Sequence, residues 1–306
     1  MAPGGSTLGA LGRAAAGPLE AYGRMLEAAA ADVAGAVTGR SHPDPFALRD
    51  PHYIQRTLAA WRLASEHYFR ADVQGLDHIP ATGPVLLVGN HSGGTVIADT
   101  FVFAQSFYDH FGAQRPFFQL AHDLVFKTPG PRALLQRYGT IPASRENMAG
   151  ALERDAALLV YPGGDHETFR PSWESEEVDF ANRTGFIKLA LEHDVPVVPV
   201  VAIGGQETAL FLGQGGRAAH RLGLDRLLRL KVLPAVLGPP FGLTILDFPL
   251  RLPLPAKISI RILEPINLGE RLGPEPKVEE GYDLITSLMQ ETLTELGQER
   301  DLPVLG

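Results

Sequence analysis

Short runs of branched apolar residues alternate with longer amphipathic segments through the middle of the chain. Four runs are nearly continuous in apolar residues, as strands buried on both faces of a sheet are: 85–88, 117–120, 157–161 and 195–202. Segments with apolar positions at helical spacing separate them: 95–111, 131–137 and 184–192. This alternation predicts an α/β fold in which helices flank a largely parallel central sheet.

Amphipathic patterns also precede and follow this region. Residues 8–37 and 51–69 repeat apolar positions at helical spacing before the first strong strand. Near the end, 257–263 alternates like a strand and 282–296 like a closing amphipathic helix. Neither an internal repeat nor a long linker divides the chain. We therefore expect one α/β domain over residues 71–306 and an N-terminal helical extension over residues 1–70 that contacts a membrane.

Composition and charge exclude several classes of protein. The chain has 306 residues, of which 45% are hydrophobic, enough for a full core. A formal net charge of -8 argues against a nucleic-acid partner, which requires a basic surface. Without cysteine there is no disulfide, thiolate nucleophile or cysteine-bound metal, which fits a reducing compartment. The start of the chain does not resemble a secretion signal, and the most apolar stretch, 232–246, is too short and proline-broken to span a bilayer.

A histidine follows the first apolar run, in "VLLVGNHSGG" at residues 85–94. His91 would stand at the carboxyl edge of a parallel sheet, where open α/β folds bind ligands. Gly93 permits close approach of the backbone and presents its amide at a helix start. Asp99 lies on that helix, and a carboxylate near the imidazole would fix its tautomer and raise its basicity. The alternative is a histidine that only caps the strand, with Asp99 on the helix surface.

Two further stretches combine glycine with charged residues. "GTIPASREN" places Arg145 at a helix start, and a guanidinium can donate two parallel hydrogen bonds to a phosphate. "ALLVYPGGDHETFRP" drops from a strand into Gly163 and Gly164, whose amides could hold an oxyanion or phosphate, and ends near Arg170. The alternatives are a solvated surface arginine and an ordinary tight turn.

Two other kinds of site fit the spacing poorly. Adjacent residues such as Asp165, His166 and Glu167 diverge on a turn, and only His122 with Asp123 could be added to them, so we expect no metal. "GNHSGG" differs from the nucleophile elbow of serine hydrolases, because two residues instead of one separate the first glycine from the serine.

Four stretches taken in order resemble the conserved blocks of the PlsC-type glycerophospholipid acyltransferase superfamily: "NHSGG", "GTIPASR", "VYPGG" and "VPVVPV". They cover roughly residues 75–206. The resemblance implies that His91 is the catalytic base, assisted by Asp99, and that Arg145, with Arg170, holds a phosphate of the acceptor or donor. It implies acyl transfer from coenzyme A or an acyl carrier protein to a glycerolipid hydroxyl, with these thioesters as co-substrates and no separate cofactor.

The chain departs from that family pattern at two positions. Seven residues separate His91 from Asp99 where the usual block has four, and Gly163 stands where the usual block has glutamate. The double glycine is similar to the branch of mono- and diacylglycerol acyltransferases, whose acceptors can lack phosphate, and Glu167 is a candidate for the missing carboxylate. A lysophospholipid and a neutral acylglycerol therefore both stay open as acceptor, as does a lipid-binding or transfer protein that has lost the reaction.

A basic amphipathic stretch indicates contact with a membrane surface. Residues 217–231 combine four arginines and a lysine with five leucines, which suits an anionic lipid surface or, alternatively, a core-packing helix with a solvated basic edge. The adjoining residues 232–255 are apolar and proline-broken, as in an interfacial loop or an acyl-chain groove. We expect a peripheral protein at the cytoplasmic face of a membrane, and the sequence predicts no particular oligomeric state.

Overall fold

The computed structural model describes residues 44–122, 125–126, 131–221, 232–247, 251–300 and 302. The helices predicted within residues 8–37 and the segment 222–231 of the basic stretch lie outside these residues. From the basic stretch, the structure describes only the short helix α9 (Gly216–Arg221).

A seven-stranded sheet forms the centre of the molecule, in the order β1-β10-β6-β2-β5-β3-β4. Its strands are β1 (Asp72–Gln74), β2 (Val85–Gly89), β3 (Phe117–Ala121), β4 (Thr140–Pro142), β5 (Ala157–Val160), β6 (Val197–Ile203) and β10 (Ser259–Ile262). β2 to β6 run parallel to one another, with Leu87 level with Leu159 on one side and Val198 on the other. β10 pairs antiparallel with β6, and β1 runs parallel to β10. The predicted α/β fold with a largely parallel sheet is confirmed.

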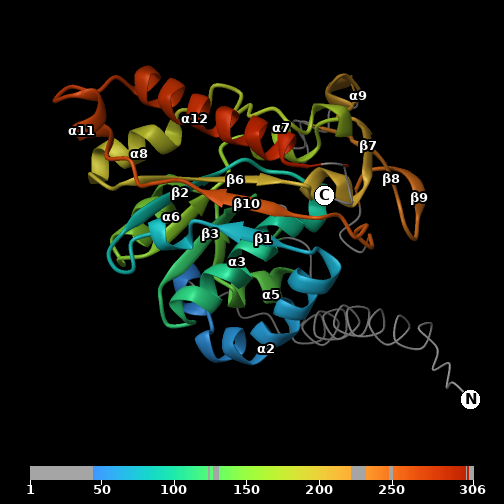
Figure 1. Ribbon diagram of the computed structural model, residues 1–306, viewed down its shortest axis with the longest axis horizontal. Coiled ribbons are helices and arrows are strands. Elements are labelled where there is room, and N and C mark those ends of the chain that lie inside the picture. The colour runs from blue at the N-terminus through green and yellow to red at the C-terminus, as the bar shows by residue number, and fades with distance from the viewer. Residues whose placement is uncertain are drawn as a thin grey trace, which may run out of the picture.

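Helices cover both faces of this sheet (Figure 1). Because successive residues of a strand point to opposite faces, Leu86 and Val88 of β2 enter one core while Val85 and Leu87 enter the other. The first core is closed by α6 (Arg145–Leu152), α8 (Gly185–His193), α11 (Leu268–Leu272) and α12 (Val278–Gln298). The second is closed by α2 (Pro51–Leu63), α3 (Ala98–Phe111) and α5 (Pro131–Arg137). All five residues of β2 are buried, as its continuous apolar run predicts.

Several helices begin at residues that bond their free amides. Asp50 caps α2 by accepting a hydrogen bond from the amide of Tyr53 at 3.0 Å, with Pro51 at the first helical position. Ser144 caps α6 in the same way, from the amide of Asn147 at 3.1 Å. The remaining short helical segments are α7 (Asp165–Thr168), η1 (Pro45–Leu48), η2 (Ala64–Tyr68), η3 (Leu76–His78), η4 (Gly94–Val96), η5 (Ser172–Glu174) and η6 (Gly205–Thr208).

The described part of the predicted extension, from residue 44 to residue 70, packs directly on the α/β domain. Ile54 of α2 is fully buried in the core beneath the sheet, beside α3. Whether residues 1–70 form a separate unit stays a prediction. Among the described helices, none combines the length and the apolar composition that crossing a bilayer requires.

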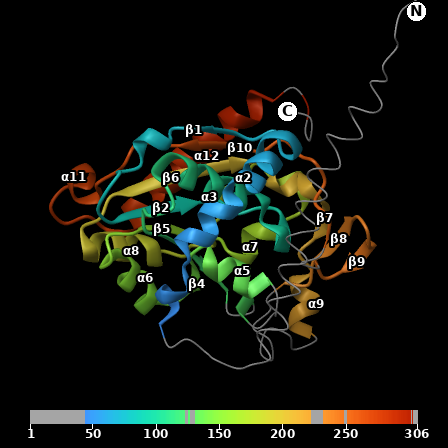
Figure 2. The same ribbon diagram turned by 90° about the horizontal axis from the view of Figure 1, so that it is seen from below.

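A second, smaller sheet lies beyond the carboxyl end of β6 and projects at one end of the molecule (Figures 1 and 2). Its antiparallel strands are β7 (Leu210–Gly213), β8 (Ala235–Gly238) and β9 (Gly242–Ile245). Part of the stretch 232–255, expected to be a proline-broken interfacial loop or acyl-chain groove, is thus a pair of strands, whereas its contact with an interface stays a prediction. Pro239 and Pro240 fall in the turn between β8 and β9, so they limit the strands instead of breaking them.

Candidate active site

Three segments converge at the carboxyl edge of the main sheet. β2 lies between β5 and β6, so the residues that follow these three strands are neighbours although they are far apart in sequence. They supply His91 after β2, Tyr161 to Glu167 after β5, and Gly204 to Thr208 after β6. This is the edge at which open parallel sheets bind ligands.

The imidazole of His91 is held from one face and from one edge. Its ring stacks on Tyr161, with ring centroids 4.2 Å apart and planes inclined by 17°. Nδ1 is buried without a hydrogen bond and lies 3.8 Å from Oδ2 of Asp99. Nε2 makes no hydrogen bond within the described part of the chain, while 14% of the side chain stays exposed. The ring therefore has one nitrogen turned to a carboxylate and the other available to a ligand.

Asp99 reaches this position through a tight loop. Its Oδ2 accepts hydrogen bonds from the amide and the hydroxyl of Ser92 at 3.1 and 3.0 Å, and its side chain is 1% exposed. The chain returns through left-handed conformations at Gly93, Gly94 and Ile97, with φ of 88°, 66° and 40°. A positive φ at a β-branched residue is strained and persists only where its surroundings hold it. The longer spacing between His91 and Asp99 is thus absorbed by η4, which also delays the start of α3 to Ala98.

Tyr161 forms the platform under the histidine, and its position depends on a glycine. A Cβ on Gly89 would lie 2.5 Å from Cε1 of Tyr161, so the ring fits over the end of β2 only because that residue has no side chain. The hydroxyl of Thr100 donates to the Tyr161 hydroxyl at 2.9 Å. Burial, together with the nearby Asp99, raises the pKa of Tyr161 well above 10. Tyr161 therefore acts as a neutral platform.

Glu167 occupies the space that a side chain at position 163 would need. A Cβ on Gly163 would overlap the Cγ, Cδ and Oε2 atoms of Glu167. The carboxylate accepts the amide of His91 on Oε2 at 3.1 Å and the amide of Asp179 on Oε1 at 3.1 Å. It is fully buried and forms an ion pair with Arg170, whose Nη2 lies 2.7 Å from Oε1. Position 163 has no carboxylate, but Glu167, four residues later, places its carboxylate at the backbone amide of His91.

Arg170 is bonded within the protein. Its side chain is 7% exposed; Nη2 forms the ion pair with Glu167, while Nε and Nη1 donate to the carbonyls of Glu167, Glu174 and Glu177. A phosphate at Arg170 would have to replace these contacts. The structure therefore gives Arg170 the environment of a residue that positions Glu167.

Burial raises the pKa of Glu167 from its ordinary 4.5 to about 7, although Arg170 and the two amides act in the opposite direction. A carboxyl with a raised folded-state pKa stabilises the fold fully below its unfolded pKa, and this contribution is lost as the pH rises through about 7. Glu167→Gln removes the titration. We expect the unfolding free energy of the wild type minus that of this variant to be larger at about pH 5 than at about pH 8. Urea unfolding at both pH values measures it, and a difference that grows with pH would contradict it.

Most amides of the histidine loop are already bonded to side chains. The amide of Gly93 donates to Oε1 of Gln206 at 3.0 Å, and that of Thr95 donates to Oδ2 of Asp247 at 2.6 Å. Gly93 would have to release Gln206 in order to serve an oxyanion. Within the described residues, the amides of Gly94 and Gly163 make no recorded hydrogen bond, whereas that of Gly164 closes a turn on the Tyr161 carbonyl at 3.1 Å. These two amides are therefore free of competing bonds within the described residues, which makes them candidates to stabilise a developing negative charge.

Arg145 lies apart from this cluster. It begins α6 after β4, the edge strand that β5 and β3 separate from β2. Its side chain is 74% exposed, and Nη2 contacts both carboxylate oxygens of Glu192 at 2.6 Å. The structure thus does not bring Arg145 to His91, and a phosphate bound there would compete with Glu192. Its role stays a prediction.

The acidic and histidine side chains after β5 diverge. Asp165 pairs with Arg183 at 2.9 Å, His166 contacts Asp179 at 2.7 Å, and Glu167 turns inward to the histidine loop. No three His, Asp or Glu side chains in the described ranges converge as metal ligands would. That the reaction uses no metal stays a prediction.

Sequence reasoning missed four residues that fix the histidine loop. The side-chain amide of Asn90 exchanges two hydrogen bonds of 2.8 Å with the backbone of Ala202 in β6, and so continues the pairing of β2 with β6 beyond the end of β2. From the other side, Arg251 donates to the Gly93 carbonyl at 3.1 Å and pairs with Asp247 at 2.8 Å. Gln206, Asp247 and Arg251 come from segments distant in sequence, so spacing carries no signal for them. Only Asn90, next to the histidine, could have been singled out.

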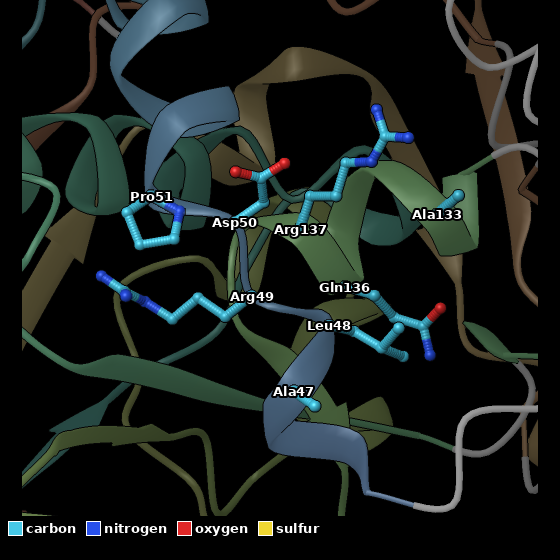
Figure 3. A pocket seen from close by; sticks show the side chains of 8 residues that line it. All are labelled: Ala47, Leu48, Arg49, Asp50, Pro51, Ala133, Gln136 and Arg137. Atoms are coloured by element: carbon cyan, nitrogen blue, oxygen red, sulfur yellow. The ribbon is translucent and has the colours of Figure 1, made fainter.

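A separate surface pocket lies on the helical side of the molecule. It has a volume of about 410 Å³ and is lined by residues of η1, by Arg49 and Asp50 in the connection to α2, by the start of α2 and by residues of α5 that include Arg137 (Figure 3). None of its lining residues belongs to the cluster around His91.

In a comparison with protein families, residues 70–203 match the family described as Acyltransferase. An uncharacterized protein of Mycobacterium leprae is 26% identical over 250 residues, which cover 81% of this chain and 65% of that protein. An uncharacterized protein of Mycobacterium tuberculosis is 28% identical over 267 residues, covering 85% and 71%. The "DGAT1/2-independent enzyme synthesizing storage lipids" of Bos taurus is 31% identical over 142 residues, which cover 46% of this chain and 41% of that enzyme. The chain thus spans less than two thirds of the first and the third of these proteins.

Among solved structures, the 1-acyl-sn-glycerophosphate (LPA) acyltransferase PlsC from Thermotoga maritima aligns with a TM-score of 0.49 and 18% identity. The alignment covers 81% of this chain and 78% of that one.

Proposed function

Because residues 70–203 match the family described as Acyltransferase, we propose that the protein transfers a fatty acyl group from a thioester to a hydroxyl group of a glycerolipid. One observation carries this proposal: His91, at the carboxyl edge of the sheet, turns Nδ1 to the buried Asp99, and its Nε2 has no partner among the described residues. A base oriented in this way suits the removal of a proton from an alcohol. Acyl-coenzyme A and an acyl carrier protein are the proposed donors.

The chemistry follows from these groups. Nε2 of His91 accepts the proton of the acceptor hydroxyl while the hydroxyl oxygen attacks the thioester carbonyl carbon. Asp99 stabilises the imidazolium, as 3.8 Å contacts of this kind commonly shorten when substrate binds. The amides of Gly94 and Gly163 stabilise the oxyanion, at about 3 kcal/mol per donor in comparable sites. The carbon–sulfur bond then breaks, and the imidazolium returns the proton to the leaving thiolate. This sequence needs no acyl-enzyme and no metal.

We propose a lysophospholipid or a related glycerolipid as the acceptor. A neutral acylglycerol is the second candidate, because Gly163 replaces the usual glutamate and because Glu192 already neutralises Arg145. The name of the bovine relative, an enzyme synthesizing storage lipids, agrees with this second candidate. The site would work at the cytoplasmic face of a membrane, where such acceptors are found.

The direct test is turnover of acyl-coenzyme A by the purified protein with a panel of acceptors. Thiol release and the mass of the lipid product would be measured with lysophosphatidic acid, other lysophospholipids, monoacylglycerol and diacylglycerol. Acceptor-dependent thiol release with a matching acylated product is expected for one class. If every acceptor binds and none is acylated, the protein is instead a lipid-binding or transfer protein.

Arg145→Ala separates the two acceptor classes in the same assay. If Arg145 holds a phosphate of the acceptor, its removal abolishes a charge-assisted contact of about 1.5–3 kcal/mol, or roughly tenfold to a hundredfold in kcat/KM, only for phosphorylated acceptors. Glu192→Ala is the matched control, since it frees the guanidinium and should weaken no acceptor. Equal losses for phosphorylated and neutral acceptors would assign Arg145 to the donor or to structure.

A further inference from the structure

The small sheet of β7, β8 and β9 has an apolar face that nothing in the described part of the chain covers. Phe211 and Val236 point inward and pack with Ala209 against Phe169. The alternate positions point outward: Leu210, Leu237 and Leu243 stand level with one another across the three strands, and they are 42%, 43% and 64% exposed. Ile245 adds a side chain that is 68% exposed. Antiparallel sheets normally present polar residues on their outward face, whereas the outward face of this sheet is apolar. We call these four side chains the leucine face.

Exposed apolar residues are concentrated around this sheet. The described residues include ten large apolar side chains with high exposure, and seven of them fall between Leu210 and Leu246. Neither 209–213 nor 232–246 contains a charged residue. β9 is an edge strand, and edges of this kind are normally protected by charges, prolines or a covering segment. An uncharged edge with an apolar face is a surface for an apolar partner.

The charge of the connection between β7 and β8 indicates what kind of partner covers the leucine face. Residues 214–234 contain Arg217, Arg221, Arg226, Arg229 and Lys231 against the single acid Asp225. Five positive charges and one negative charge give +4, in a chain whose net charge is -8. Both ends of this connection are fixed to the small sheet, because it begins after β7 and ends before β8. A second copy of the chain would bring the same positive charge to the contact, whereas anionic headgroups over an apolar layer match both features.

The leucine face is directly connected to the histidine loop. Asp247, two residues after Ile245, accepts the amide and the hydroxyl of Thr95 on Oδ2 at 2.6 and 2.9 Å. Arg251 binds Asp247 and the Gly93 carbonyl. Asp247 and Arg251 are 8% and 2% exposed. A surface that contacted lipid here would stand beside the site that needs a lipid substrate.

We propose that the leucine face inserts into the surface of an anionic lipid bilayer and docks the protein with its histidine loop at the headgroups. This inference deepens the proposed function and rests on it for its purpose, but the docking itself can be measured without turnover. Insertion of Leu237, Leu243 and Ile245 supplies the apolar contact, and the arginines of the β7–β8 connection supply the attraction to anionic headgroups.

The test is flotation with vesicles of phosphatidylcholine and phosphatidylglycerol. Leu243→Asp/Ile245→Asp should lower the vesicle partition coefficient at least about tenfold, since each side chain loses its apolar transfer. Leu243→Thr/Ile245→Thr removes the same contact while keeping β propensity, and it covers the case in which aspartate unfolds the sheet. Leu63→Asp is the comparison within the predicted N-terminal extension: this leucine is 51% exposed at the end of α2, away from the small sheet, and its substitution leaves binding unchanged if the leucine face, not the extension, docks the protein.

A second measurement locates the contact. The chain has no cysteine, so a single cysteine carries a fluorescent label without background. A polarity-sensitive label at Ile245→Cys should shift to the blue when vesicles are added, and one at the exposed Lys188→Cys should not. Lys188 lies on α8, at the opposite end of the molecule in both views (Figures 1 and 2).

Three results would overturn the docking proposal: unchanged flotation of both double variants, loss of flotation with Leu63→Asp alone, or a lipid-free dimer that the double variants abolish. The proposed function fails separately. If docking and function are both right, Leu243→Thr/Ile245→Thr keeps turnover on detergent-dispersed acceptor, and His91→Ala floats like the wild type. Docking without turnover by the wild type would refute the acyltransferase and leave the lipid surface in place.

Discussion

His91→Ala should lower kcat/KM for acyl transfer by at least about a hundredfold, the lower end for a positioned general base. The ring is the only imidazole that the structure places beside Asp99, Tyr161 and the glycine amides within the described residues. Alanine removes the proton acceptor and leaves the backbone contact to Glu167 intact, since that contact uses the amide of residue 91. Thiol release under saturating donor and varied acceptor measures the loss.

The control for this variant is His52→Ala, on the exposed side of α2. It should keep turnover, because a surface substitution away from special contacts changes stability by only about 0.5 kcal/mol. Thermal unfolding of both variants separates chemistry from folding. A His91→Ala protein that unfolds like the wild type and still turns over at the wild-type rate would remove His91 from the mechanism.

At about pH 8, above the pKa of about 7 for Glu167, Glu167→Ala should cost about 3–5 kcal/mol of unfolding free energy, because it leaves the Arg170 guanidinium buried without its counter-ion. Glu192→Ala provides a matched comparison, since it also removes a glutamate from an arginine. The Arg145–Glu192 pair is exposed, and exposed pairs contribute about 0–1 kcal/mol. Denaturant unfolding of the two variants measures the contrast, and equal costs would show that the Glu167–Arg170 pair does not stabilise the fold.

The overlap between position 163 and the Glu167 side chain predicts that substitutions at these two positions are coupled. Gly163→Ala alone should cost about 1–3 kcal/mol, because its Cβ overlaps the Glu167 side chain. In the Glu167→Ala background the overlapping atoms are gone, so the cost of Gly163→Ala should fall to within about 0.5 kcal/mol of zero. A double-mutant cycle by denaturant unfolding gives the coupling. Additive costs would mean that Glu167 does not fill the space left by Gly163.

The parts of this fold that the sequence predicts are those set by local pattern. The continuous apolar runs place β2, β3, β5 and β6 within a few residues of their observed ends, since strands buried on both faces have no polar alternation to obscure them. The order of these strands brings His91 to the carboxyl edge, as expected. The small sheet could not be predicted, because its outward residues are apolar and give no polar and apolar alternation, and because its prolines are typical of loops.

The site itself is only partly readable from sequence. Seven residues separate His91 from Asp99 along the chain, and the structure brings their side chains to 3.8 Å. Whether a guanidinium faces a ligand or a neighbouring acid depends on tertiary contacts. Spacing therefore could not predict that Arg145 pairs with Glu192 or that Arg170 pairs with Glu167. Tyr161 reads as the end of an apolar strand, and only the missing side chain at Gly89 explains why its ring can support the imidazole.

The bond between Asp247 and Thr95 has a geometric consequence. The residue that follows strand β9 by two positions is bonded to the loop that carries the imidazole, so a tilt of the strand is opposed by two hydrogen bonds to that loop. If the leucine face docks on a bilayer as proposed, this connection sets the distance between the bilayer plane and Nε2, and inserting one residue between Leu246 and Asp247 would change that distance while keeping both the imidazole and the leucine face.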